Sequence, residues 1–377
     1  MTQSGELALV MSGGGARAAY QVGALHWLAK RFPTASIPVL TGVSAGAINA
    51  AFLGVHAGNF LERVEKLCDV WSELRVENVF RVGPMGLFTH VIDSALSLVS
   101  GGHHKPKHHG MVDTAPLRVF LEHVLLAKDG ELVGVAENLE RGVVRAVALT
   151  AASYTTGRSV TFIQGRDVES WERADRTSRT CILRVEHVMG SAALPIFFPA
   201  VQIETGYYGD GGMRLTAPLA PAVHLGAQRI LAISTRHVPD MAETRMHALK
   251  GYPPPAQIFG DVMSAIFLDQ FDGDALRLER INQLIENAPP EKRGNLRPVK
   301  LMLLRPSRDL GRLANEYEPR LPRTFRFLTR GLGTQQTRSN DLISLVMFQP
   351  DYLKRLLELG EEDAAERAGE IEKFLGG

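Results

Sequence analysis

Residues 6–17, ELALVMSGGGAR, and residues 37–46, IPVLTGVSAG, hold the two glycine-bearing turns that decide the fold. An apolar run precedes each turn, and a short apolar run that ends in turn residues predicts a buried strand. Between the turns, apolar residues recur at helical spacing over residues 17–30, and Phe32-Pro33 ends the pattern. The two strands are therefore expected to be parallel neighbours joined by a helical crossover.

Both turns should lie at the same edge of this sheet. A right-handed crossover brings the two loops to the carboxyl end of the strands, where open α/β folds bind ligands. The helix expected after the second turn, at residues 45–57, begins with small residues that let it pack closely beneath the turn. Its positive end would point towards Ser44.

Ser44 lies in the segment GVSAG of residues 42–46, which is the pattern of a nucleophile elbow. In such a turn the flanking glycines, here Gly42 and Gly46, let a serine hydroxyl stand clear of the backbone. The first turn would supply exposed backbone N–H groups beside it, from Gly13, Gly14 and Gly15. Together the two segments predict acyl transfer through a serine, with a preformed site for the negative oxygen of the transition state.

A serine nucleophile needs a base, which is predicted at Asp210, in the segment GYYGDGG of residues 206–212. Glycines this dense lose much backbone entropy on folding, which is reasonable at a sharp turn or where the chain closely approaches another backbone. A plain turn is the alternative, because Asp-Gly-Gly is ordinary turn chemistry. In company with the two upstream motifs, Asp210, Gly211 and Gly212 are better explained as a catalytic turn.

A Ser-Asp-His triad of the α/β-hydrolase type is the main rival. It would need a histidine after Asp210, and His224, His237 and His247 are available. None of the three has a setting comparable to the glycine cluster around the aspartate. The dyad is therefore preferred.

Nucleotide binding fits less well. The spacing Gly13-x-Gly15-x-x-Ala18 satisfies a relaxed dinucleotide fingerprint, but that site needs an acidic residue some 20 positions on. No Asp or Glu occurs from Leu7 to Leu61, and the Gly-Lys-Ser/Thr of a P-loop is missing. The acid-free stretch agrees instead with an anion site. Arg17 would either add positive charge there or, as we favour, hold the loop by hydrogen bonds to its carbonyls.

Composition excludes several classes of protein. With 42 basic and 41 acidic residues the formal net charge is +1, so no global basic surface indicates a nucleic-acid partner. Cys68 and Cys181 are too few for a disulfide scaffold, and neither has metal-ligand spacing. The N-terminus resembles no secretory signal, and no window approaches the ~18 to 20 apolar residues of a membrane span. A cytoplasmic protein that can work at a membrane surface is expected.

Later strands are predicted at residues 143–150, 159–164, 229–234 and 298–304. Because the last of these lies so far along the chain, one α/β domain with a mainly parallel sheet is expected over residues 1–308. A mainly helical segment is expected at residues 309–377.

Residues 101–110, GGHHKPKHHG, contain four histidines that could ligate a metal. Their glycines and proline give no fixed geometry and no carboxylate lies among them, so a solvated basic loop is favoured and no metal site is expected. An apolar stripe precedes this loop at residues 87–99. An ordinary core-facing helix is the favoured interpretation, and a lid or an interfacial helix that dips into lipid is the alternative.

These motifs resemble the bacterial patatin-like phospholipases. The resemblance is carried by SGGGAR at residues 12–17, GVSAG at 42–46, SAALPIFFP at 191–199 and DGG at 210–212, and less specifically by FQPDYL at 348–353. It implies a three-layer α/β/α fold, Ser44 as nucleophile, Asp210 as general base, and the amides of residues 13–15 as oxyanion hole. It also implies an acyl-enzyme, with no catalytic metal or cofactor. Ser191 is interpreted as a buried residue without a chemical role.

The expected activity is hydrolysis of fatty-acyl esters of phospholipids or lysophospholipids at a peripheral membrane surface, by a protein that could be a homo-oligomer. Three alternatives stay open. A water-soluble carboxylesterase or an acyltransferase could use the same dyad, and a lipid-binding scaffold could carry a vestigial site. Substrate preference separates the enzymes, and labelling of Ser44 by a fluorophosphonate separates them from the scaffold.

Overall fold

The computed structural model describes residues 6–81, 110–239, 255–268, 270–294, 296–320 and 340–376. Three sequence predictions lie outside these ranges. They are the apolar stripe at residues 87–99, the histidine-rich loop at 101–110 apart from Gly110, and the candidate histidine His247.

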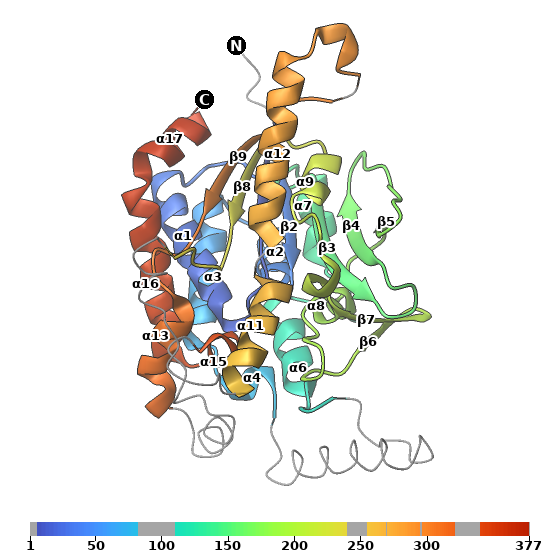
Figure 1. Ribbon diagram of the computed structural model, residues 1–377. Coiled ribbons are helices and arrows are strands. Elements are labelled where there is room, and N and C mark those ends of the chain that lie inside the picture. Colours follow the sequence, from blue (N-terminus) through green and yellow to red (C-terminus); the bar gives the residue numbers. More distant parts are fainter. Residues whose placement is uncertain are drawn as a thin grey trace.

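A sheet of nine strands runs through the centre of the described part of the chain (Figure 1). Its main path has the order β5-β4-β3-β2-β1-β8-β9. From β3 to β9 all neighbours are parallel, which confirms the predicted pairing of the first two strands. The strands of this path are β1 (Leu7–Met11), β2 (Val39–Val43), β3 (Ala146–Ser153), β4 (Ser159–Gly165), β5 (Arg176–Thr180), β8 (Arg229–Ile233) and β9 (Lys300–Leu304).

A short antiparallel hairpin completes the sheet at the site. It consists of β6 (Val201–Ile203) and β7 (Gly206–Asp210), and β7 pairs with the end of β3. Val43, the last residue of β2, is opposite Thr150, and Asp210 is opposite the next residue, Ala151. Since β4 occupies the other edge of β3 here, β2 and β7 meet end to end along one edge. This register brings Asp210 next to the residue that follows β2, which is Ser44.

Helices cover both faces of the sheet, which gives the predicted three layers (Figure 1). One face packs against α1 (Ala18–Arg31), α2 (Ala45–Val55), α3 (Phe60–Glu73) and α16 (Pro350–Glu366), and the other against α9 (Ala220–His224) and α12 (Gln270–Asn287). Further helices are α4 (Val76–Val79), α6 (Ala115–Val124), α7 (Val133–Glu140), α8 (Val185–Ser191), α11 (Pro255–Phe267), α13 (Leu310–Tyr317), α15 (Asp341–Val346) and α17 (Ala368–Gly376). Short 3-10 turns occupy Gly15–Arg17, Gly211–Arg214, Pro290–Lys292 and Glu318–Arg320.

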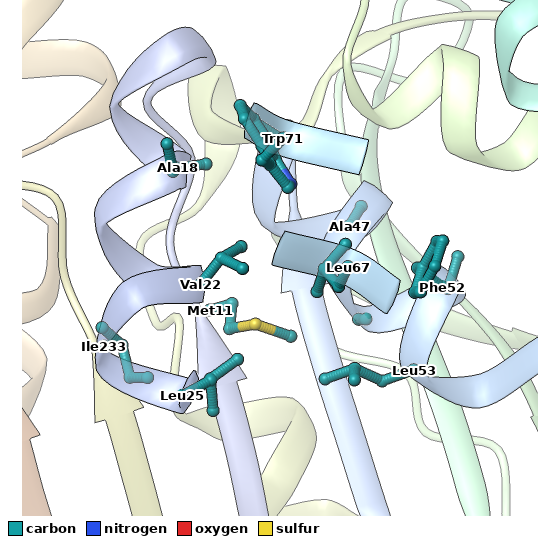
Figure 2. Packing of buried hydrophobic residues seen from close by; sticks show 14 of the residues in the cluster. Met11, Ala18, Val22, Leu25, Ala47, Phe52, Leu53, Leu67, Trp71 and Ile233 are labelled. Atoms are coloured by element: carbon teal, nitrogen blue, oxygen red, sulfur yellow. The ribbon is translucent and has the colours of Figure 1, made fainter. Parts of the chain in front are cut away.

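The larger core lies beneath the glycine turns. Figure 2 shows Met11 of β1 among Val22 and Leu25 of α1, Leu53 of α2 and Leu67 of α3, all of them buried. These contacts join both strand–turn–helix units of the N-terminal segment to one apolar cluster. Packing therefore fixes the positions of the two turns relative to each other.

The helix α16, in the C-terminal part of the chain, lies directly against α1. At Gly23 of α1, a Cβ would collide with the backbone of Leu357, and at Gly360 of α16 it would collide with the carbonyl of Tyr20. The two helices therefore approach closely at both points, and the buried side chains of α16, such as Leu353 and Leu356, belong to the larger core. The domain division at residue 308 stays a prediction.

No helix within the described ranges combines the length and the apolar character that crossing a membrane requires.

Candidate active site

Ser44 occupies a strained turn between β2 and α2. Its φ of 55° and ψ of −130° lie in a region that side-chain-bearing residues rarely adopt. Ser44 is buried, with 7% of its surface exposed to solvent. Glycine is required on both sides, because a Cβ at Gly42 or Gly46 would collide with neighbouring backbone atoms. The sharp strand-to-helix turn predicted from the sequence is thus present, with the serine at its apex.

The triglycine loop lies beside this serine. A Cβ at Gly13 would be 3.0 Å from Ser44 Cβ and 3.6 Å from Ser44 Oγ. Gly14 and Gly15 have positive φ angles of 141° and 54°, and a Cβ at Gly15 would overlap the carbonyl of Leu345. Within the described ranges, the amides of Gly13, Gly14 and Gly15 donate no hydrogen bond to the protein. Such unpaired N–H groups are the donors that a developing oxyanion requires.

Other residues hold the carbonyl side of the loop. The Thr235 hydroxyl donates to the Gly13 carbonyl at 2.7 Å, and the Thr235 amide donates to Ser12 Oγ at 3.1 Å. Gln21 Nε2 donates to the Ser12 carbonyl at 2.8 Å. The loop is thus fixed through its carbonyls, while its amides stay unengaged. No motif in the sequence pointed to Thr235 or Gln21.

Asp210 is fully buried at the end of β7. Its backbone N–H donates to the Ala193 carbonyl at 2.9 Å, and its Oδ1 accepts a hydrogen bond from the Gly212 amide at 2.9 Å. Oδ2 is enclosed and has no hydrogen bond of ordinary geometry in the described structure. The carboxylate therefore has one anchored oxygen and one oxygen available for a proton.

Burial raises the pKa of Asp210 to about 7, while the neighbouring Ser44 hydroxyl and the Gly212 amide act in the opposite direction. Desolvation dominates, because no cation among the described residues compensates the charge. A general base is most effective when its pKa lies near the working pH. The pKa of this carboxyl and its closeness to the serine hydroxyl both fit that role.

The glycines after Asp210 permit close packing around the carboxylate. A Cβ at Gly211 would collide with the Thr150 carbonyl and approach Val43 Cγ2 to 2.7 Å, and a Cβ at Gly212 would approach Phe267 Cδ1 to 2.5 Å. The dense glycine cluster thus marks a close backbone approach, one of the two explanations that the sequence allowed.

Arg17 is buried and makes a different set of contacts from the one expected. Its Nε donates to Ser344 Oγ at 2.7 Å, and its Nη2 forms an ion pair with Asp341. Asp341 Oδ2 also accepts a hydrogen bond from Ser264 at 2.6 Å. The predicted hydrogen bonds to loop carbonyls are not formed, because the guanidinium turns towards α15. Arg17 therefore ties the glycine loop to α15 and α11.

Ser191, set aside in the sequence as a packing residue, contacts the elbow directly. The backbone N–H of Ser44 donates to Ser191 Oγ at 3.0 Å, and this hydroxyl donates to the Thr150 carbonyl at 2.6 Å. The Ser44 amide is consequently engaged and is not free to bind an oxyanion. The amides of the triglycine loop, in contrast, donate no hydrogen bond within the described ranges.

The described candidate histidines make contacts away from Ser44. His224 stacks on Trp171 with 4.6 Å between ring centroids, and His237 Nδ1 lies 3.0 Å from the Pro306 carbonyl. His187, which was not one of the candidates, is buried, and burial lowers its pKa to about 4. Its Nδ1 accepts a hydrogen bond from the Arg184 amide. No hydrogen bond joins Ser44 to a histidine within the described ranges.

An apolar pocket opens beside Ser44, with an empty volume of about 860 Å³ that includes its part open to solvent. Apart from the two glycines and Ser44 itself, its walls are hydrophobic side chains from α2, α3, α4, α6, α11 and α15, and from segments that follow α3, α8 and α15. They include Ile48, Phe52, Leu67, Trp71, Leu117, Phe120, Val124, Leu194, Phe198, Phe267, Leu345 and Phe348. Such a cavity suits a long hydrocarbon group whose polar end lies at the serine.

Metal-ligating side chains do not form a cluster within the described ranges. No group of three or more His, Cys, Asp or Glu residues there is close enough to hold an ion. Both cysteines are free, and burial raises the thiol pKa of Cys68 to about 12 and that of Cys181 to about 11. Neither thiol is therefore a ready nucleophile at neutral pH.

Comparison with known proteins places these features in one family. The family model described as patatin-like phospholipase matches residues 9–223, more than half of the 377 residues. This range includes every residue of the predicted dyad, the glycine loop and the elbow. Comparison with curated proteins gave no match.

Two solved structures are similar over nearly the whole chain. VipD from Legionella pneumophila is 13% identical with a TM-score of 0.38, and the alignment covers 99% of this chain and 67% of that one. Human GIVD cytosolic phospholipase A2, solved in complex with methyl gamma-linolenyl fluorophosphonate, is 14% identical with a TM-score of 0.48, and 59% of its chain is covered. Because the family model matches more than half of the chain, including the elbow and the aspartate turn, the chain belongs to the patatin-like phospholipase family.

Proposed function

We propose that this protein hydrolyses fatty-acyl esters of phospholipids or lysophospholipids through a Ser44–Asp210 dyad. One observation carries the proposal. In the described structure, a serine on a strained turn lies beside backbone amides that donate no hydrogen bond and close to a buried carboxyl whose pKa is about 7, and it lines an apolar pocket. Membership of the patatin-like phospholipase family supports lipid ester hydrolysis.

In the first half of the reaction, Ser44 Oγ attacks the ester carbonyl and its proton passes to Asp210. The carbonyl oxygen takes the negative charge, which the amides of the triglycine loop stabilise. As the tetrahedral intermediate collapses, the bond to the leaving alcohol breaks and the alcohol takes the proton from Asp210. The product is an acyl ester on Ser44.

In the second half, water replaces the alcohol. The water oxygen attacks the acyl carbonyl while Asp210 takes a proton from the water. The amides of the triglycine loop again stabilise the negative charge on the carbonyl oxygen. Collapse releases the fatty acid, and the proton returns to Ser44 Oγ. Asp210 must be ionised at the start of each half, so the rate should rise as the pH passes its pKa.

The pocket supports a long acyl chain as the recognised group. Its apolar walls exclude a charged headgroup, which would remain at the opening. Removal of a long chain from water into this space would favour binding by hydrophobic transfer. A soluble ester with a short acyl group would leave most of the pocket unfilled.

Apolar residues beside the pocket support contact with a lipid surface. Val119 is 66% exposed and lies in α6 between the pocket residues Leu117 and Phe120. Ile196 is 65% exposed, has a positive φ of 71°, and lies between the pocket residues Leu194 and Phe198. Insertion of such side chains at a membrane interface would bring the opening to the lipid.

Assays of purified variants on mixed phospholipid micelles and on a soluble short-chain ester would test the proposal. Fatty-acid release, followed by mass spectrometry, should be strong for wild type on micelles and lost in Ser44→Ala and Asp210→Asn. Asp167→Asn is the matched control, because Asp167 is exposed and tolerates asparagine at its positive φ of 52°. Undiminished release by either dyad variant would refute the mechanism.

The same assays separate the remaining alternatives. Higher kcat/KM for the soluble ester, with no rise above the critical micelle concentration, would indicate a carboxylesterase. Transfer of the acyl group to added lysolipid in preference to water would indicate an acyltransferase. Failure of wild type to react with a fluorophosphonate at Ser44 would indicate a lipid-binding scaffold.

A further inference from the structure

Ser191 joins three parts of the catalytic region through one hydroxyl. It is the last residue of α8 and is completely buried. Its Oγ accepts the backbone N–H of Ser44 at 3.0 Å and donates to the carbonyl of Thr150 at 2.6 Å. The elbow, strand β3 and the end of α8 are thus connected at a single point.

The same short segment also holds Asp210. Two residues after Ser191, the carbonyl of Ala193 accepts the backbone N–H of Asp210 at 2.9 Å. Residues 191–193 therefore bind the backbone of both members of the proposed dyad, one through a side chain and the other through a carbonyl. The Asp210 contact uses only main-chain atoms, whereas the Ser44 contact depends on the serine side chain.

The geometry excludes a second nucleophile at this position. The hydroxyl hydrogen of Ser191 is directed to the Thr150 carbonyl, and no part of the residue is exposed to a substrate. What the hydroxyl does is pair two buried backbone groups that would otherwise be unpaired. One of them belongs to a residue whose φ of 55° needs external support to persist.

We propose that Ser191 is a positioning residue that fixes the distance between the Ser44 hydroxyl and the Asp210 carboxylate. The inference rests on the proposed function, because the separation matters only if the two groups exchange a proton. Loss of the hydroxyl leaves the Ser44 amide and the Thr150 carbonyl without partners. The turn then relaxes towards another acceptor, and the serine hydroxyl moves with it.

Substitution of Ser191 should therefore lower turnover without weakening substrate binding. In Ser191→Ala we expect kcat to fall roughly 10- to 100-fold, the range that loss of a buried hydrogen bond and a displacement near 1 Å would produce. KM should change less than about threefold, since Ser191 does not line the pocket. Ser191→Cys keeps a weak donor and acceptor and should fall between alanine and wild type.

A second buried serine provides the control. Ser178 on β5 accepts the Trp171 amide at 2.8 Å, so Ser178→Ala also removes a hydroxyl that pairs a buried backbone N–H. It lies on β5, which is at one end of the sheet and pairs with β4, whereas the dyad residues follow β2 and end β7. Its loss should reduce stability and leave kcat near that of wild type.

The experiment measures kcat and KM per active site, with sites counted by mass spectrometry after exhaustive fluorophosphonate labelling. A general folding defect reduces the number of labelled sites, whereas mispositioning reduces turnover at each labelled site. The order wild type and Ser178→Ala, then Ser191→Cys, then Ser191→Ala supports the inference. Equal turnover per site in Ser191→Ala and Ser178→Ala would overturn it.

The two proposals fail in different ways. If wild type shows neither labelling at Ser44 nor fatty-acid release, the proposed function fails and the positioning role fails with it. If wild type is active and both Ser191 variants match its turnover per labelled site, only the positioning role fails. Should Ser191→Ala not fold, Ser191→Cys against Ser178→Ala gives the same decision.

Discussion

The turn at Ser44 and the turn at Asp210 meet in one site, but each is costly to form in its own way. Ser44 has an unusual backbone conformation, with φ of 55° and ψ of −130°, and its uncharged side chain is easily accommodated. Asp210 has an ordinary backbone, with φ of −51° and ψ of 126°, but its carboxylate is fully buried. One turn therefore carries conformational strain and the other carries desolvation.

This difference implies that the two halves of the dyad respond differently to substitution. Removal of the Ser44 hydroxyl abolishes the nucleophile and leaves the strained backbone as it was. Removal of the Asp210 charge abolishes the base and relieves the electrostatic penalty. Activity would be lost in both cases, and stability would rise in only one.

The largest expected effect is on catalysis. Ser44→Ala should show no acyl-enzyme and no measurable fatty-acid release, and Asp210→Asn should lose about 100- to 10,000-fold in kcat, the usual contribution of a general base. Steady-state assays on micellar phospholipid measure both. Retention of more than a tenth of wild-type kcat in Asp210→Asn would show that another group takes the proton.

The next effect is on folding at the glycine loop. In Gly15→Ala, the new Cβ meets the Leu345 carbonyl at a φ of 54°, so we expect a loss of about 2 to 4 kcal/mol in the free energy of unfolding. Gly13→Ala adds no strain from a positive φ, and its Cβ would lie 3.0 Å from Ser44 Cβ and 3.6 Å from Ser44 Oγ. Urea denaturation should therefore show the smaller loss for Gly13→Ala, while activity falls in both. The reverse order of stabilities would contradict this structure of the loop.

The third effect is a rise in stability at Asp210. Burial raises the carboxyl pKa to about 7 in the folded state, against about 3.9 when unfolded. Between these values the folded protein binds a proton that the unfolded chain does not, so wild-type stability should fall as the pH rises from about 4 to about 7. Asp210→Asn lacks this penalty. Its Tm should exceed that of wild type at pH 8, and the difference should shrink towards pH 4.

The exposed Asp167→Asn is the control for that comparison, and its Tm should follow wild type at each pH. A constant difference in Tm between Asp210→Asn and wild type would mean that the carboxyl is not desolvated. A lower Tm for Asp210→Asn at pH 8 would mean that the charge stabilises the fold. Either result would remove the contrast between the two turns.

The smallest effect concerns the backbone at Ser44. Glycine adopts the observed φ and ψ without strain, so Ser44→Gly should be more stable than Ser44→Ala by about 1 kcal/mol. At an ordinary helix position the order is reversed. Chemical denaturation of these two inactive variants measures how the backbone conformation at residue 44 changes the free energy of unfolding, independently of catalysis. Greater stability of the alanine variant would show that the turn is not strained.

Sequence reasoning found the parts of the site that depend on local backbone requirements. Ser44, Asp210 and the triglycine loop each lie among glycines that a sharp turn or a close approach demands, and the first crossover follows from short apolar runs. The polar strand β5 and the short strands β6 and β7 carry no comparable pattern, so they were not predicted. Their positions come from pairing with β4 and β3.

The supporting contacts could not be found in the same way, because they join distant positions. Ser44 and Ser191 are 147 residues apart, and Arg17 and Ser344 are 327 apart. Such pairs leave no periodicity or spacing in the sequence. The same holds for the pocket, whose walls combine α2 and α3 with Phe267, Leu345 and Phe348 from the later part of the chain. Three-dimensional packing alone assembles them.

The most direct test of the dyad is the rate at which a fluorophosphonate labels Ser44 between pH 4 and pH 9, in wild type and in Asp210→Asn. The account predicts that the wild-type rate rises through a pH near 7, as Asp210 ionises, and that the variant reacts slowly with no such rise. A variant profile that matches wild type, or labelling at a different residue, would contradict it.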